Sequence, residues 1–147
     1  MGIPNVTRPC AFVFVRSGDR ILISEMVDPV EGRFYRPAGG GIEFGETSRD
    51  AARRELREEL DIDVGELELL GVLENVFTFR GAPYHEICFV FETWVGSDLL
   101  AGLNGTTISG TASVDGETAR VFELGEFGTI EPIYPEGVVQ LLPTVSS

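Results

Sequence analysis

The chain has 147 residues and a net charge of −13, with 43% hydrophobic and 24% charged residues. This length fits a single domain over residues 1–147, and the two fractions are close to those of globular proteins. Such an acidic chain is not expected to bind a nucleic-acid polymer, because that affinity comes largely from Lys and Arg. All eleven basic residues are arginine, which excludes Schiff-base chemistry and a Walker A loop, since both need lysine.

Two cysteines, Cys10 and Cys88, stand far apart in the sequence, each in an apolar run. Free cysteine is among the most often buried residue types, so both are expected to be small core residues. The N-terminus has no charged start followed by an apolar stretch. No apolar run approaches the roughly 20 residues that a membrane-spanning helix needs. These features favour a cytoplasmic protein in a reducing compartment.

The chain up to Gly41 predicts short strands separated by turns. Apolar runs predict strands at 10–15 and 20–24, joined by a turn at 17–19. A loop is expected over 26–32. A short strand at 34–36 is then expected to end at Pro37, because proline and the three glycines at 39–41 favour a loop.

The rest of the chain predicts one strong helix, several strands and a closing helix. Residues 49–60 contain no Gly, Pro or Val, and Thr47 or Ser48 can cap their start, so they predict a helix. Strands are expected at 66–73, 76–80, 87–95 and 119–123, with a loop containing some strand over 96–116. Pro135 suits the first position of a helix over 135–142. This order of elements indicates an α/β layered domain.

Three glutamates share one face of the predicted helix. Glu55, Glu58 and Glu59 are spaced i, i+3 and i+4. Like charges at this spacing destabilise a helix by roughly 0.2–0.5 kcal/mol, and Arg54 relieves only part of this by pairing with Glu58. A bound Mg²⁺ or Mn²⁺ would relieve more, because carboxylates are the hard ligands that these ions take. The helix alone is equally consistent with a solvated acidic face.

A fixed pattern joins this helix to the glycines before it. Gly40 is followed by five residues, Glu46, seven residues and then the run RELREELDI at 54–62. This pattern resembles the Nudix box, and the order of the surrounding strands also resembles that of the Nudix family. The resemblance implies a Nudix-type α/β/α sandwich with a mixed β-sheet. It also implies a MutT-like pyrophosphohydrolase acting on acid anhydrides in phosphorus-containing compounds.

One fixed position departs from the family pattern, since Asp61 stands where the family has glycine. That glycine follows the helix, where a left-handed backbone conformation is expected. Aspartate tolerates this conformation better than most residues, at some cost. We therefore expect local strain or a shifted helix end, with the three helix glutamates still able to bind metal.

The resemblance implies a metal site and a set of catalytic groups. Glu55, Glu58 and Glu59 would bind Mg²⁺, or alternatively Mn²⁺, together with a backbone carbonyl of Gly40 or its neighbour. Arg54 would orient these acids. Glu46 would either lie near the metal or act structurally at the helix start.

The identity of the general base stays open at this stage. Such a base must lie within hydrogen-bond reach of the attacking water. Glu59 is one candidate. Glu117, in a late loop, and Glu86, at the start of a strand, are two others. His85 is a further candidate for a ligand or base, although a structural hydrogen bond is the favoured role for it.

Arginines are the candidates for binding substrate phosphates, because guanidinium binds phosphate bidentately. Arg36 is favoured because it directly precedes the proline and glycines, and Arg80 and Arg33 are further candidates. Four aromatic residues at strand spacing are expected mainly in the core, although they have the chemistry to stack on a base: Phe77, Phe79, Tyr84 and Trp94.

The expected function is metal-dependent hydrolysis of a phosphoanhydride in a nucleoside diphosphate linked to another moiety, such as a nucleoside triphosphate or ADP-ribose. The expected partner is a small anionic nucleotide and not a membrane, and the resemblance leaves a homodimer open. A catalytically silent nucleotide sensor on the same fold is the main alternative, which the intact glutamate set argues against. A metal-binding interaction protein without a nucleotide is a third reading, and it leaves the glycines unexplained.

Overall fold

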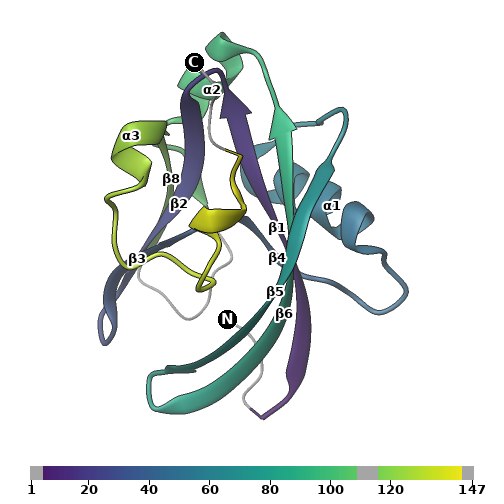
Figure 1. Ribbon diagram of the computed structural model, residues 1–147, viewed down its shortest axis with the longest axis vertical. Helices are drawn as coiled ribbons and strands as arrows, with labels where there is room; N and C mark the ends of the chain where they lie inside the picture. Colours follow the sequence, from purple (N-terminus) through teal and green to yellow (C-terminus); the bar gives the residue numbers. More distant parts are fainter. Residues whose placement is uncertain (1–4, 109–115, 144–147) are drawn as a thin grey trace.

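The computed structural model describes residues 5–108 and 116–143. Within them the strands are β1 (Thr7–Ser17), β2 (Arg20–Asp28), β3 (Gly32–Arg36), β4 (Ala38–Gly41), β5 (Glu68–Phe79), β6 (Ala82–Trp94), β7 (Thr107–Ile108) and β8 (Gly116–Glu123). The helices are α1 (Ser48–Leu60), α2 (Ser97–Leu103), α3 (Leu124–Phe127) and the 3₁₀ helix η1 (Val139–Leu141) (Figure 1). No described helix combines the length and apolar character that crossing a membrane requires.

The sheet is mixed because β1 and β6 run parallel, whereas the other strand pairs are antiparallel. Its order is β5-β6-β1-β2-β8-β7, with β3 paired to β2 and β4 paired to β1. Cys10 lies opposite Cys88 in the parallel pair, and both are free and buried, as predicted.

The hairpin of β1 and β2 opens into two branches. The two strands pair only at their joined end, where residues 15–17 oppose 20–22. Further along, β1 pairs with β4 and β2 pairs with β3. Pro37 lies where the chain passes from one branch to the other, and its lack of an N–H suits a position outside both ladders. A pocket is lined from both branches, by Phe12 of β1 and Phe34 of β3.

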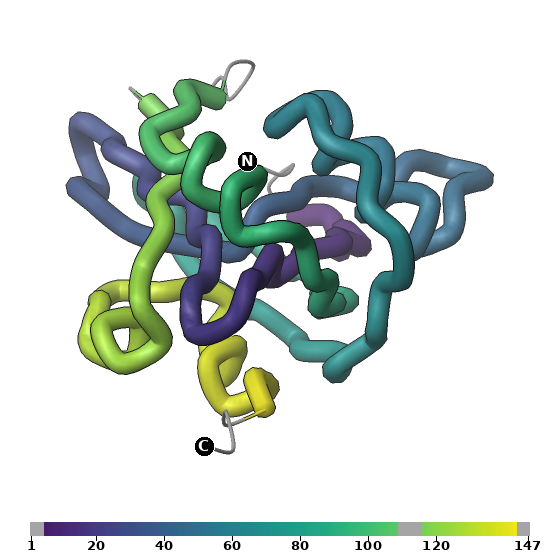
Figure 2. The backbone as a smooth tube through the Cα atoms, turned by 90° about the horizontal axis from the view of Figure 1, so that it is seen from above, coloured from purple at the N-terminus to yellow at the C-terminus, as the bar shows by residue number. Residues whose placement is uncertain are grey.

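Helices cover both faces of the sheet (Figure 2). On one face, α1 and α2 bury Leu56 and Leu100 in a cluster with Val13. On the other face, α3 packs Phe127 edge-on against Phe14, with 5.8 Å between the ring centroids. Successive strand residues point to opposite faces, which is why Val13 and Phe14 belong to different clusters. This arrangement confirms the predicted α/β/α sandwich.

Several strands extend beyond their apolar runs. Strand β2 continues to Asp28, so the predicted loop over 26–32 is too long, and β5 is continuous over Glu68–Phe79, so the break predicted within it is wrong. The glycines at 39–41, predicted as a loop, belong to β4 and pair with residues 10–12 of β1. Pairing with a distant strand fixes the conformation of these segments, and local propensity does not report it.

Two helical segments also differ from prediction. Helix α2 lies inside the predicted loop over 96–116, held by the buried Leu100 and Leu103, while residues 109–115 of that loop lie outside the described residues. The helix predicted over 135–142 is wrong. The amides of Val138 and Leu141 each donate to the carbonyl three residues back, as in 3₁₀ turns. Gly137, with φ of 87°, interrupts any α-helix there.

Helix α1 begins and ends as the sequence predicts. Its N-cap is Thr47, whose Oγ1 accepts a hydrogen bond from the Asp50 amide at 3.1 Å. At the other end Asp61 has φ of 55° and ψ of 43°, and its amide donates to the Arg57 carbonyl at 3.0 Å. Asp61 therefore adopts the left-handed conformation expected of the glycine that it replaces, and the helix end is not shifted.

We expect Asp61→Gly to stabilise the protein, because glycine adopts this conformation without a Cβ and removes a negative charge from the helix C-terminus. Asp61→Ala removes the same charge but keeps a Cβ, so it should be less stable than Asp61→Gly by about 1–2 kcal/mol. Urea unfolding of both variants and the parent would measure the differences. Equal stability of the two variants would show that the left-handed backbone carries no strain.

Candidate functional site

Three carboxyl groups lie near one another between helix α1 and strand β8. Glu55 and Glu59 come from one face of α1, and their side chains are hydrogen-bonded to each other. Glu117 comes from β8, is buried, and lies close enough to disfavour negative charge on Glu59. The amide of Gly39 donates to Oε1 of Glu59 at 3.1 Å, which ties the helix to strand β4. The site therefore joins the helix, the glycine strand and a late strand.

The pKa of Glu59 is raised to about 9, first because burial disfavours its charged form. Arg36 opposes this shift, whereas the carboxylates of Glu117 and Glu55 add to it. Two carboxyl groups in contact share one proton, and both ionise only when a cation lies between them. A divalent ion would supply the positive charge that a shared proton supplies in the protein alone. These hard oxygen donors therefore have the chemistry that suits a divalent ion.

Two glycines of β4 allow close packing on either side of this strand, Gly39 against β1 and Gly40 against helix α1. Gly39 has φ of 142°, and a Cβ there would collide with the Ala11 carbonyl of β1. A Cβ on Gly40 would lie 2.8 Å from Oε1 of Glu55. A side chain at Gly40 would therefore push Glu55 and α1 away from the strand, and one at Gly39 would disturb the pairing of β4 with β1. The glycines give β4 a smooth surface against which Glu55 can lie.

Arg54 holds the acids of α1 in place from the solvent side. Its guanidinium donates to both oxygens of Glu46, at 2.7 and 2.9 Å, and to the Gly41 carbonyl at 3.0 Å. It also donates to Glu55 at 3.0 Å and to Glu58 at 3.2 Å. The hydrogen bonds from Arg54 lower the pKa of Glu46 to about 2. Glu46 thus acts structurally in this arrangement, through Arg54.

Glu58 is set apart from the other helix acids. Its side chain is 59% exposed and bonded to Arg54, and it does not join Glu59 and Glu117. Within residues 5–108 and 116–143, no group of three or more His, Cys, Asp or Glu side chains has an arrangement that could hold a metal ion. Arg54 engages the carboxylates of both Glu55 and Glu58, so metal binding by all three helix glutamates requires side-chain rearrangement around this arginine. The ligand set, including the backbone of Gly40, stays a prediction.

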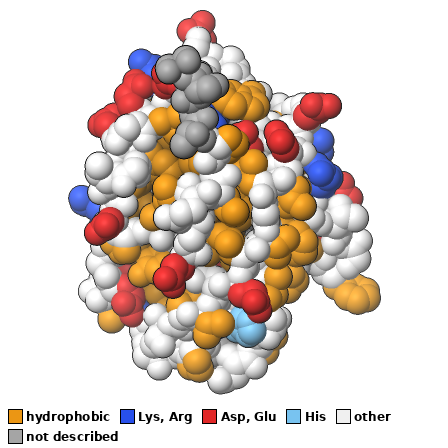
Figure 3. Space-filling view, viewed as in Figure 1, with side chains coloured by type: hydrophobic (Ala, Val, Ile, Leu, Met, Phe, Trp, Pro, Cys, Tyr) orange, Lys and Arg blue, Asp and Glu red, His pale blue; other side chains and the backbone are white. Residues whose placement is uncertain are grey.

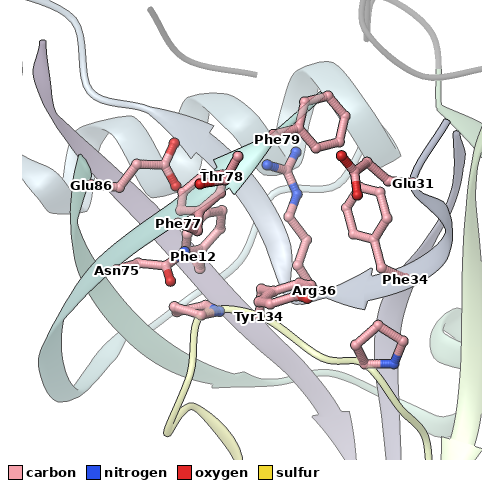
Figure 4. Close-up of a pocket in the computed structure, with 12 residues that line it drawn as sticks. Phe12, Glu31, Phe34, Arg36, Asn75, Phe77, Thr78, Phe79, Glu86 and Tyr134 are labelled. Atoms are coloured by element: carbon pink, nitrogen blue, oxygen red, sulfur yellow. The ribbon is translucent and has the colours of Figure 1, made fainter. Parts of the chain in front are cut away.

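Arg36 lies on the inner side of the acids. One of its guanidinium nitrogens donates to the Gly39 carbonyl at 3.3 Å and lies 4.0 Å from Glu117. Its positive charge also interacts with the carboxyl groups of Glu59 and Glu86. The same side chain lines the pocket between the two branches of the sheet (Figure 4). Arg36 therefore stands where a phosphate held at the acids would meet the rest of a substrate in the pocket.

The other charged candidates lie outside this cluster. Arg80, at the turn between β5 and β6, forms an ion pair with Asp28 on β2. Arg33 is exposed on β3. His85, the only histidine in the chain, reaches the surface (pale blue in Figure 3) and lies 3.4 Å from the Thr7 hydroxyl, in line with the favoured structural role. Substrate binding by Arg80 stays a prediction.

The pocket also contains polar groups from β5 and β6. Glu86, one candidate base, lines it together with Asn75, and both are buried. Sequence reasoning does not single out Asn75. Alternate residues of a strand point to the same face, so Leu73 and Phe77 predict an apolar side chain at position 75, where the sequence has asparagine. That exception to the alternation is the signal that identifies it.

The four aromatic candidates have different places. Phe77 and Phe79 line the pocket, and Tyr84 stacks on Phe77 with 5.3 Å between the ring centroids. Trp94 lies elsewhere, 54% exposed, with the guanidinium of Arg16 4.3 Å from its ring centroid. Phe77 and Phe79 are therefore the two that a ligand in the pocket would meet.

Comparison with known proteins agrees with this geometry. The family model of the NUDIX domain matches residues 6–137. A MutT NUDIX hydrolase from Burkholderia pseudomallei superposes with a TM-score of 0.67 at 20% identity, over 93% of this chain and 97% of that one. A NUDIX hydrolase from Nitrosomonas europaea gives a TM-score of 0.62 at 16% identity, over 92% and 84%.

A MutT protein from Methanosarcina mazei Go1 also gives a TM-score of 0.62, at 14% identity over 95% of this chain and 93% of that chain. At these identities the structural matches establish the fold, while the family model covers most of the sequence, including the box at residues 40–62. The chain therefore belongs to the Nudix family and is a pyrophosphohydrolase of that family.

Proposed function

We propose that this protein hydrolyses a phosphoanhydride bond in a nucleoside diphosphate linked to another moiety, such as a nucleoside triphosphate or ADP-ribose, and that it requires a divalent metal ion. The observation that carries the proposal is the contact between the carboxyl groups of Glu55 and Glu59 beside Glu117. In this cluster the pKa of Glu59 is raised to about 9. Such crowding of carboxyl groups is costly without a cation, and a metal bridging to substrate phosphates removes the cost.

The proposed metal ligands are Glu55, Glu58, Glu59 and a backbone carbonyl of Gly40 or its neighbour. Mg²⁺ is the expected ion and Mn²⁺ the alternative, since both take carboxylate and phosphate oxygens. When bound, the ion would polarise the phosphoryl oxygens and lower the pKa of the attacking water. The same charge would draw an anionic substrate toward a chain whose net charge is −13.

The side chains of the protein supply the remaining roles. Glu59 and Glu117 are the proposed acceptors of the proton from the attacking water, because both carboxylates lie beside the place where phosphate would be held. Arg36 would donate hydrogen bonds to a phosphate oxygen, since its guanidinium lies between these acids and the pocket. Arg54 would orient Glu55 and Glu58 through its existing hydrogen bonds.

Hydrolysis of a panel of nucleotides should depend on the helix glutamates. With Mg²⁺ present, Glu58→Gln and Glu59→Gln should each lower kcat/KM by about 10²–10⁴-fold, because the amide keeps the shape but loses the charge and basicity. Released phosphate or pyrophosphate would measure turnover, and circular dichroism would confirm folding. Glu74→Gln is the matched control, since Glu74 is an exposed glutamate of β5, and it should retain parental activity.

Absence of turnover across the panel, with nucleotide binding still measurable by calorimetry, would contradict the proposal. That result would assign the chain to the nucleotide sensors. Full activity in Glu59→Gln would equally contradict the role given to this carboxyl group.

The pH dependence of stability should report the Glu59 carboxyl group. Its pKa is about 9 in the folded protein against an ordinary value of 4.5, so the folded state binds more protons than the unfolded state between these values. Stability in chelator should therefore fall as pH rises from about 5 to 9. Glu59→Gln should show a smaller fall. Mg²⁺ should raise the melting temperature of the parent at pH 8 more than that of the variant.

Differential scanning fluorimetry at several pH values, with and without Mg²⁺, would test this. Parallel melting curves for the parent and Glu59→Gln across the range would show that the buried carboxyl group is not protonated in the folded state.

A further inference from the structure

The pocket between the branches of the sheet is linked to the acid site by Arg36, which lines the pocket and lies 4.0 Å from Glu117. Its walls come from β1, β3, β5, β6 and the segment around Pro132 and Pro135. In Figure 4, Glu86 and Asn75 lie to one side of Arg36, and Phe34 and Glu31 lie to the other. A ligand whose phosphates reach the acids would therefore place its nucleoside part beside these walls.

Two of the walls are aromatic. Phe77 lines one side, backed by Tyr84, whose ring is nearly parallel to it at 13°. Phe34 lines the other side, supported edge-on by Phe79 and Tyr134 at 6.1 Å between ring centroids. Aromatic rings held in place by neighbouring rings provide flat surfaces for stacking. The pocket is therefore suited to a planar ring system.

One side of the pocket carries a buried carboxylate. Glu86 on β6 lies opposite Asn75 on β5 in the strand register, and the two residues are only 5% and 6% exposed. The carboxylate of Glu86 accepts a hydrogen bond from the Cys10 thiol, and its nearest oxygen is 3.7 Å from the guanidinium of Arg8, which is longer than a hydrogen bond. A carboxylate only accepts hydrogen bonds, whereas the Asn75 amide both donates and accepts. A ligand that bonds to Glu86 at this side must therefore bring hydrogen-bond donors such as N–H groups.

The charges of the pocket exclude an acidic occupant. Two carboxylates, Glu31 and Glu86, line it against the single guanidinium of Arg36, which already faces Glu117. A second phosphate or a carboxylate in the pocket would meet like charge in a site of reduced dielectric. The phosphates of a ligand would thus lie at the acids. The pocket would take the uncharged part of the ligand, a planar ring with N–H groups.

We propose that Glu86 and Asn75 determine base specificity and select guanine. The two oxygens of a carboxylate match two adjacent N–H donors, which guanine presents as its ring N1–H and its 2-amino group. Adenine and cytosine place a ring acceptor beside a single amino group, and uracil and thymine have one N–H between two carbonyls. This inference rests on the proposed function and names the substrate class of the same site. It also reassigns Glu86 from candidate base to recognition of the substrate.

The test compares GTP with ITP, which lacks only the 2-amino group, and with ATP and CTP, in the parent and in Glu86→Gln. The parent should favour GTP over ITP by about 10- to 100-fold in kcat/KM, the range expected for a hydrogen bond to a charged group. Glu86→Gln should reduce that ratio to below about threefold. Glu74→Gln is the control, because Glu74 neighbours Asn75 on β5 but is exposed, and it should keep the ratio.

Binding of the products GMP, IMP and AMP to the parent, measured by calorimetry, gives a readout that needs neither turnover nor a variant. GMP should bind at least tenfold more tightly than IMP. Equal turnover of all bases, or an unchanged GTP-to-ITP ratio in folded Glu86→Gln, overturns the guanine inference and leaves the hydrolase proposal standing. Selective GMP binding that depends on Glu86, with no turnover of any nucleotide, supports the inference and overturns the hydrolase proposal.

Discussion

The close contact of helix α1 with strand β4 is the interaction on which the site depends. Gly40 leaves space for the Glu55 carboxylate, and the Gly39 amide donates to Glu59. Bringing the helix this near places two carboxyl groups between its own backbone and a buried strand, where water no longer solvates them fully. The raised pKa of Glu59 follows directly from this contact.

Arg54 and Arg36 divide the charge balance of the site between them. Arg54 lies on the outer side and binds Glu46, Glu55 and Glu58. Arg36 lies on the inner side, near Glu117. The outer arginine stabilises the acids when no metal is present. The inner one lines the pocket, where we propose that it meets the substrate. Two identical side chains thus have different roles because they approach the same acids from opposite directions.

The sequence predicts the helix, its cap and its acids well, because these are local features. Thr47, Asp61 and the Arg54–Glu58 pair all follow from spacing along one helix. The strand at β4 and the burial of Glu117 depend instead on pairing between distant segments, such as Met26 with Glu117. Local propensity reports neither. It places the glycines in a loop, whereas the lack of a side chain at Gly40 is what allows this strand to lie under the helix.

The pocket was less predictable for the same reason. Asn75 and Glu86 meet only because β5 and β6 form a long hairpin, and Phe34 faces them only because β3 pairs with β2. The chemistry of the acids can be deduced from a run of residues at 40–62. The lining of the pocket is assembled from five separate stretches of chain, and no single stretch reveals it.

The division of the β1–β2 hairpin into two branches has a consequence for how this protein can change. The branch that contains β1 and β4 supports the acids, while β5, β6 and β3 shape most of the pocket. Mutations in the hairpin of β5 and β6 can therefore change the shape of the pocket without moving the acids of α1. A fold with this layout can vary its pocket while its acid site is preserved. Different strands hold the two parts in place.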